Sequence, residues 1–134
     1  MKLPGRFLRR QPHTTRRQGV VTVEFALVAP IIFLIFFGAL DIASMNFARH
    51  AMGFAAYESA RKLTIPGGTV TSGQAEALRQ LNLVGLGTGA VIDITDSPTS
   101  VTSTIRIPSS RFSWGPVGYF SGYTLRETCT LTKE

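Results

Sequence analysis

The clearest feature of the hydrophobic pattern is an apolar run near the start of the chain. Residues 20–40 read VVTVEFALVAPIIFLIFFGAL, and Glu24 is the only charged residue among them. As a helix this run would be about 31 Å long, enough to cross the hydrocarbon core of a bilayer. A buried core helix is the alternative, but the rest of the chain is too short and too polar to surround it. The pattern therefore predicts a transmembrane helix.

The helical pattern continues beyond this predicted span. Residues 41–63 contain no proline and are rich in helix formers, and the helix is expected to end where Pro66 is followed by two glycines. Small residues recur four positions apart, as Ala39/Ala43, Ser44/Ala48, Ala51/Ala55 and Ala56/Ala60. Such rows either let helices approach closely or reflect a plain alanine-rich helix. A continuous stem of about 40 residues is predicted, apolar in its first half and amphipathic in its second.

The remaining residues predict a small α+β head. The sequence of residues 71–74 (TSGQ) resembles a capping box, and we expect a short helix after it that carries Ala75, Leu78 and Leu81 on one face and ends at Gly85 and Gly87. Alternation of apolar and polar residues predicts three antiparallel strands, over residues 90–95, 101–107 and 123–132.

Two parts of the head do not follow the strand pattern. Glu127 interrupts the apolar row of the third strand, so we expect it at a sheet edge or paired with Arg126 or Arg106. Residues 108–122 form a loop rich in Ser, Gly and aromatic residues, including Phe112 and Trp114. Packing over the sheet is the favoured interpretation of this loop, and a partner-binding tip is the alternative.

Charge is distributed very unevenly along the chain. The net charge is +6, yet residues 1–19 contain six basic and no acidic residues, whereas residues 20–134 contain eight of each. A nucleic-acid-binding protein needs its basic surface on the folded part, so nucleic acid is not expected as a partner. The basic leader instead predicts, by the positive-inside rule, a cytoplasmic N-terminus and an extracytoplasmic C-terminal part.

Glu24 is the residue of the apolar run that needs an explanation. An ionised acid in a membrane segment is costly unless it reaches the interface or has a partner. A free α-amino group on Val20 would be a cationic partner, and it requires cleavage after Gly19. Ordinary signal cleavage is a weaker interpretation, because the apolar run is long and no clean A-x-A site follows it.

The residues around this glycine resemble a type IV prepilin cleavage site. The string RRQGVVTVEFALVAP, residues 16–30, is closer still to the TadE-like minor pilins of tight-adherence (Flp) pili. The resemblance implies that a prepilin peptidase cuts after Gly19 and that Val20 becomes the N-terminus, with or without a methyl group. It also implies that Glu24, followed by Phe25, serves recognition and subunit register. Pro30 is then a helix kink that either has a function or is neutral.

Nothing in the sequence indicates catalysis. The chain has no G-x-S-x-G, P-loop, H-E-x-x-H or C-x-x-C motif, and no metal or cofactor is expected. His50 has no second ligand at a suitable spacing and is expected to be solvated or interfacial. Cys129, the only cysteine, is expected to be buried and inert, with an intermolecular bridge as the alternative.

The sequence thus predicts four segments and a structural role. They are a cleaved leader (1–19), a transmembrane helix (20–40), a stem extension (41–65) and an extracytoplasmic head (66–134). The resemblance implies a single-pass protein of the inner membrane that contacts lipid, a prepilin peptidase and other pilin subunits, and that joins in pilus assembly and adhesion. The alternatives are an uncleaved membrane protein whose head binds a partner, and a secreted domain.

Overall fold

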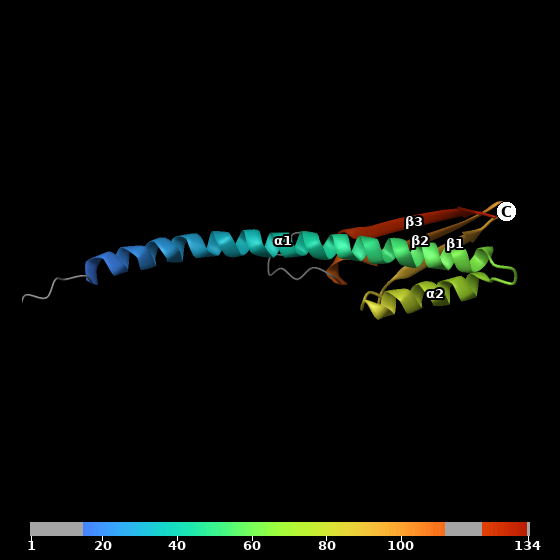
Figure 1. The fold of residues 1–134 in the computed structure, drawn as a ribbon, viewed down its shortest axis with the longest axis horizontal. Helices are drawn as coiled ribbons and strands as arrows, with labels where there is room; N and C mark the ends of the chain where they lie inside the picture. Colours follow the sequence, from blue (N-terminus) through green and yellow to red (C-terminus); the bar gives the residue numbers. More distant parts are fainter. Residues whose placement is uncertain (1–14, 112–121, 134) are drawn as a thin grey trace, which may run out of the picture. The chain divides into compact units, whose positions relative to one another are not determined.

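The computed structural model describes residues 15–111 and 122–133, with side chains from residue 19 onward. The elements are helix α1 (Thr15–Thr64), helix α2 (Val70–Leu83), strand β1 (Val91–Asp96), strand β2 (Ser100–Pro108), a 3₁₀ turn (Ser109–Arg111) and strand β3 (Thr124–Thr132) (Figure 1). This α+β fold confirms the predicted fold class. The chain divides into two compact units between Ile35 and Phe36.

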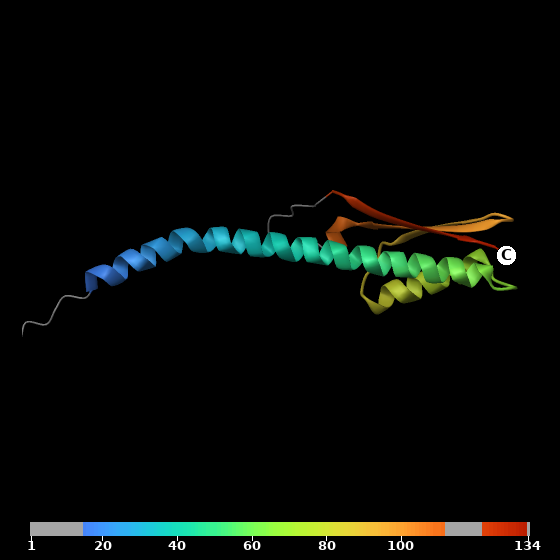
Figure 2. The ribbon, with the colours of Figure 1, turned by 45° about the horizontal axis from the view of Figure 1, so that its top comes forward.

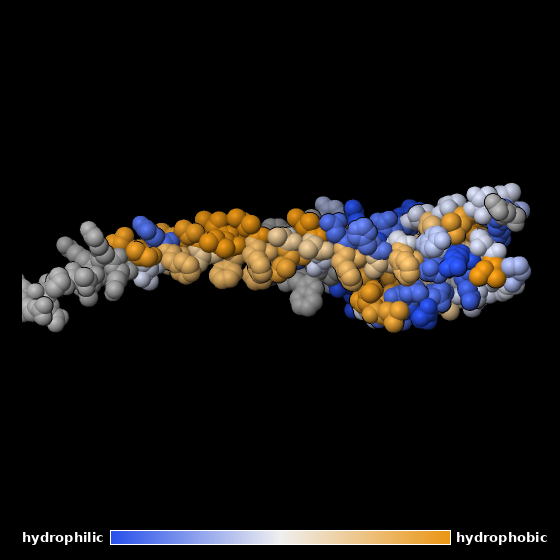
Figure 3. Space-filling view, viewed as in Figure 1, coloured by the Kyte–Doolittle hydropathy of each residue, from blue (hydrophilic) through white to orange (hydrophobic). Residues whose placement is uncertain are grey.

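The first unit consists of the N-terminal part of α1. Its apolar side chains are exposed rather than packed, and Phe25 and Leu27 are 68% and 70% exposed. Figure 3 shows them as an almost continuous hydrophobic surface along this part of the helix. Within the described chain, α1 is the one helix long and apolar enough to cross a membrane.

In the second unit, α1 continues to Thr64, one residue before the predicted end of the stem. Thr64 Oγ1 donates a hydrogen bond to the carbonyl of Arg61, and the amide of Gly68 donates to the carbonyl of Ile65. Gly67 has a φ of 86°, a left-handed conformation that side chains disfavour. The Pro-Gly-Gly sequence therefore ends the helix as its pattern indicated.

The sheet has the order β1-β2-β3, and both strand pairs are antiparallel. The predicted strands agree with the observed ones to within one residue at each end. Their alternation is also confirmed on β2, where the side chains of Val101, Ser103, Ile105 and Ile107 are all buried. This row forms the inner face of the sheet, which packs against α1 and α2.

Small residues supply much of the contact between α1 and the head, together with Met52 and Leu63. Ala48, Ala55, Ala56 and Ala60 are fully buried, the first three in the main core with residues of α2, β2 and β3 and Ala60 in a smaller cluster with Val101 of β2. Ala39 and Ala43, the first of the four-residue rows, remain exposed. The rows within residues 48–60 therefore let α1 lie close to its own sheet, and a neighbouring helix is not needed to explain them.

A buried hydrogen bond lies at the centre of this contact. Ser59 Oγ donates to Ser103 Oγ at 2.6 Å, and Ser59 Oγ also lies 2.9 Å from the carbonyl of Ala56. Both serines are fully buried. Since a buried hydroxyl without a partner is costly, the pair favours one position of α1 along β2 over its neighbours.

The start of α2 differs from the prediction. The capping box consists of Thr69 and Ser72, whose side chains and backbone amides bond reciprocally at 3.0 and 3.2 Å, so the helix begins earlier than a box at residues 71–74 would place it. The predicted apolar face is also wrong in part: Leu81 is buried, whereas Ala75 and Leu78 are exposed.

The buried face of α2 follows from close packing against α1. It consists of Gly73, Ala77 and Leu81, spaced four residues apart. A Cβ at Gly73 would collide with the side chain of Leu63 and lie 3.1 Å from the carbonyl of Ser59. Only the smallest residues allow α2 to approach α1 this closely, and hydrophobicity alone did not reveal this face.

Gly73→Ala should therefore destabilise the head by about 1–3 kcal/mol, although alanine is the better helix former. Gly53→Ala is the matched control, because a Cβ there meets nothing within 4 Å. That change should stabilise the chain by up to about 1 kcal/mol. Thermal unfolding of the full chain in detergent measures both, and an equal effect of the two changes would contradict this account of α2 packing.

Candidate functional site

The residues of the expected processing site all lie on α1. Gly19, Val20, Glu24 and Phe25 belong to one uninterrupted helix, and all four are exposed. Val20 and Glu24 are four residues apart and so lie on the same side of the helix. Because no residue of the described chain covers them, the segment is accessible along its length.

Pro30 lies inside α1, and the helix continues on both sides of it. A proline cannot donate the hydrogen bond to residue 26, so the ladder of helical bonds lacks one member at this point. Membrane helices tolerate such a gap when neighbouring groups satisfy the freed carbonyl. The role of this proline as a kink stays a prediction.

Asp41 follows directly after the predicted span and is only 2% exposed. It is the first buried residue along α1, so the packed part of the second unit begins where the apolar run ends. In the sequence, Asp41 was not distinguishable from the other polar residues of the predicted amphipathic stem. Burial of this carboxyl depends on tertiary packing, which the sequence pattern does not show.

The side of α1 opposite the sheet is apolar and exposed. Phe36, Leu40, Phe47 and Phe54 recur four and seven residues apart, so they lie within about 40° of one line along the helix. Phe47 and Phe54 are 57% and 55% exposed. The second unit therefore has two apolar faces on one helix, one covered by the head and one largely exposed, although Phe47 and Phe54 also line cavities beside the head.

Glu127 lies on β3, an edge strand of the sheet, which agrees with the predicted alternative of a position at a sheet edge. Its ion pair is with Arg49 of α1, at 4.0 Å, and not with Arg126 or Arg106. The Arg106 guanidinium instead pairs with Asp93 at 3.3 Å. Glu127 faces the helix because it belongs to the inner row of β3, and no local sequence signal pointed to Arg49.

A shallow cavity lies beside this ion pair. It is lined by Asn46, Arg49, His50, Gly53, Phe54 and Glu127, and its volume is about 560 Å³. His50 is exposed at its wall, as expected for a solvated or interfacial side chain. The cavity combines one apolar ring with a cation and an anion, so it suits a side chain of a partner better than a reacting substrate.

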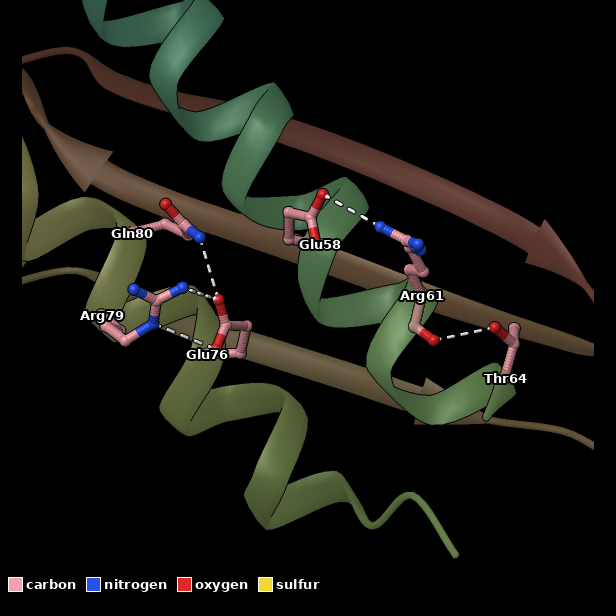
Figure 4. Close-up of polar contacts among 6 residues, drawn as sticks. All are labelled: Glu58, Arg61, Thr64, Glu76, Arg79 and Gln80. Carbon is pink, nitrogen blue, oxygen red and sulfur yellow. Dashed lines mark hydrogen bonds and ion pairs between the residues drawn. The ribbon is translucent and has the colours of Figure 1, made fainter. Parts of the chain in front are cut away.

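Two polar groups, one on α1 and one on α2, lie beside each other near the C-terminal end of α1. Figure 4 shows their members, which are Glu58, Arg61, Thr64, Glu76, Arg79 and Gln80. Arg79 binds both carboxylate oxygens of Glu76, at 2.6 and 3.1 Å, and Gln80 donates to Glu76 at 2.9 Å. These hydrogen bonds, that of Arg79 first, lower the pKa of Glu76 below its ordinary value.

Cys129 is half-buried on the inner row of β3, against the main core. Burial raises the pKa of its thiol, so the thiol stays protonated at neutral pH and is a poor nucleophile. This environment favours the inert interpretation of the cysteine.

Among the described residues, no group of three or more His, Cys, Asp or Glu lies close enough together to hold a metal ion.

The predicted loop over residues 108–122 begins later than expected, since β2 includes Pro108 and a 3₁₀ turn follows it. Phe112 and Trp114 lie outside the described residues.

Together these features describe a chain with a long N-terminal helix, apolar in its first half, and a small α+β head. A family model described as TadE-like protein matches residues 19–61, which lie entirely within α1. The resemblance to the TadE-like pilins of tight-adherence systems is thereby confirmed over this segment. No curated protein and no solved structure matches the chain.

The family match supports a coarse statement of function. TadE-like pilins are structural proteins, and a pilin contacts other pilus subunits and the assembly machinery. The long apolar helix and the family together fit a membrane-anchored protein with a pilus-related role.

Acid should weaken the cluster around Glu76 in a defined direction. Because the folded pKa of Glu76 lies below the unfolded value, its contribution to stability is present above about pH 4.5 and is lost as the pH falls through the folded pKa. We expect Glu76→Gln to flatten the fall of the melting temperature with acid below that pH. Arg79→Gln should flatten it too, and an unchanged acid dependence in both variants would contradict the assignment.

Proposed function

We propose that this chain is a TadE-like minor pilin whose leader is removed after Gly19 and whose mature form takes part in assembling a tight-adherence pilus. The observation that carries the proposal is the combination of the G-x4-E site with an exposed apolar helix, within the segment that matches the family. A prepilin peptidase is the expected processing partner.

Removal of the leader explains the charge distribution. All of the net charge lies in residues 1–19, and the mature chain from Val20 would have equal numbers of acidic and basic side chains. The leader sets the orientation with its N-terminus in the cytoplasm, so the head is extracytoplasmic. Once the leader is gone, no cluster of cations holds the start of the helix at the cytoplasmic surface.

Glu24 would then select the stagger between neighbouring subunits. Its carboxylate lies on an exposed, apolar part of α1, where an unpaired charge is costly in lipid or in a helix bundle. The N-terminal amine of Val20 in a neighbouring subunit is the expected partner. The exposed stripe of Phe36, Leu40, Phe47 and Phe54 supplies apolar area for contact between stems further along.

Gly19→Ala should block processing in cells that contain the peptidase. Intact mass of the membrane-fraction protein should show a chain of 115 residues starting at Val20 for the wild type, with or without one methyl group, and the full 134 residues for the variant. Gly38→Ala is the control, because that glycine lies in the same apolar run and a Cβ there meets nothing within 4 Å. A full-length wild type would favour an uncleaved anchor, and a start near residue 45 would favour a secreted domain.

Glu24→Ala should leave the chain in the membrane but reduce its incorporation into the pilus at least tenfold, since the stagger loses its ion pair. Quantitative immunoblots of sheared pili and of membranes measure the two pools. Glu58→Ala removes an acid from α1 outside the predicted span and should incorporate normally. Normal incorporation of Glu24→Ala would contradict the register role of Glu24.

A further inference from the structure

β3 is a long edge strand that neither a bulge nor a proline interrupts and that no described element covers. Its charged residues are Arg126 and the inward-facing Glu127, which pairs with Arg49. The strand is nine residues long, contains no proline or glycine, and its ladder with β2 runs without a bulge from Pro108↔Thr124 to Ser100↔Thr132. Exposed edges are normally shortened, bulged or covered, because their free backbone groups bind other strands. Figures 1 and 2 show β3 at the border of the sheet.

The hydrogen bonds that flank the strand show which backbone groups face outward. The amide of Ser109 donates to the carbonyl of Tyr123 at 2.8 Å, and the amide of Lys133 donates to the carbonyl of Thr99 at 2.9 Å. In an antiparallel ladder alternate residues face the partner strand, so the odd-numbered residues of β3 bond to β2. The outward-facing residues are therefore Thr124, Arg126, Thr128, Thr130 and Thr132.

The opposite edge of the sheet is covered. The amide of Ser97 donates to the carbonyl of Ser100, so the odd-numbered residues of β1 bond to β2. The backbone groups of the even-numbered residues, Ile92, Ile94 and Asp96, therefore face outward. Gln74 Nε2 of α2 donates to the carbonyl of Ile92 at 3.3 Å. A Cβ at Gly73 of α2 would lie 3.1 Å from the side chain of Ile94. Helix α2 thus protects β1, and no described element does the same for β3.

Side chains of a strand added to β3 would have a place on the α1 side. The cavity beside the Arg49–Glu127 ion pair adjoins β3 and has Phe54 and Gly53 at its wall. Successive side chains of a strand point to opposite faces, so every second residue of an added strand would point to the α1 side, and one beside Glu127 would lie next to this cavity. An apolar side chain there would cover Phe54.

The outer face of the sheet indicates the charge of the added strand. Arg126 lies directly opposite Arg106 in the ladder, and like charges opposite each other are destabilising. Arg106 pairs with Asp93, whereas Arg126 has no ion pair within the described part of the chain. A carboxylate on the added strand, next to Arg126, would complete this row.

We infer that β3 accepts an extended segment of a partner protein as a fourth strand, with apolar residues toward α1 and an acidic residue beside Arg126. This inference rests on the proposed function for the partner's class, another protein of the pilus assembly. The segment would bind through the outward backbone groups of the five β3 residues named above.

A second copy of this chain does not fit antiparallel pairing at β3. Arg49 lies at Glu127, and Leu63 lies in the cluster that Leu131 packs against, so α1 and β3 run in the same direction. Two copies joined by antiparallel β3 strands would have their α1 helices reversed relative to each other. Two chains anchored in one membrane by residues 20–40 must have them in the same direction.

Amide hydrogen exchange on the full-length, processed protein tests the added strand directly. In detergent alone, the outward amides of Arg126, Thr128 and Thr130 should exchange rapidly, while those of Glu127 and Cys129 stay protected. In the assembled envelope fraction the outward amides should slow by ~100-fold. Unchanged exchange at these positions after assembly would overturn the inference.

A pair of substitutions at one position isolates the backbone group. Thr128→Pro removes an outward amide and no bond to β2, but it also removes the hydroxyl contact with Thr104 at 3.1 Å. Thr128→Val removes that hydroxyl and keeps the amide, so it is the matched control. We expect at least a tenfold loss of co-assembly for the proline variant only. Equal co-assembly of the two variants, with the head folded by circular dichroism, would contradict the inference.

A photoreactive residue in place of Thr132 identifies the occupant. Crosslinks should map by mass spectrometry to one extended, acidic segment of another protein, and the same residue in place of Val91 on β1 should not give them. Crosslinks to β3 of a second copy would refute the partner assignment. Intact mass distinguishes failure of this inference from failure of the proposed leader cleavage. A processed chain whose β3 amides are unprotected refutes only the added strand. An unprocessed chain whose β3 amides are protected refutes only the leader cleavage.

Discussion

The close packing of α1 on its own sheet is the contact on which the rest of the head depends. Three alanines, Ala48, Ala55 and Ala56, pack with Met52 and the Ser59–Ser103 hydrogen bond to hold the helix against β2. A single methyl group matters at Gly73, where α2 approaches the same helix. The position of both helices and of the sheet edges follows from this contact.

This arrangement divides the surface of α1 by function. One face holds the head, whereas Phe36, Leu40, Phe47 and Phe54 remain exposed on another, which is the face proposed above for contacts with other stems. The head adds a different kind of surface, because α2 covers the β1 edge and no element among the described residues covers β3. A subunit built in this way has an apolar surface along the stem and backbone hydrogen-bonding groups along the head.

The residues that prediction missed share one physical property: they act through contacts between distant parts of the chain. Glu127 was recognisable because it interrupts an apolar row, but its partner Arg49 is 78 positions away and has no local signal. The capping box at Thr69 and Ser72 was misplaced because several Ser and Thr residues lie close together there, and only the backbone geometry distinguishes them. Ala75 and Leu78 were assigned to the wrong face, since α2 is positioned by its smallest residues.

The amino-acid sequence alone indicated the order of helices and strands, and it predicted a membrane helix, its orientation and a processing site at Gly19 and Glu24. These depend on local properties, namely hydrophobicity, charge balance, strand alternation and helix-breaking residues. Only the tertiary structure decided which face of α1 the head covers, how Arg49 and Glu127 meet, and which edge of the sheet stays open. Those features depend on how closely two surfaces approach, and that distance is set jointly by residues far apart in the chain.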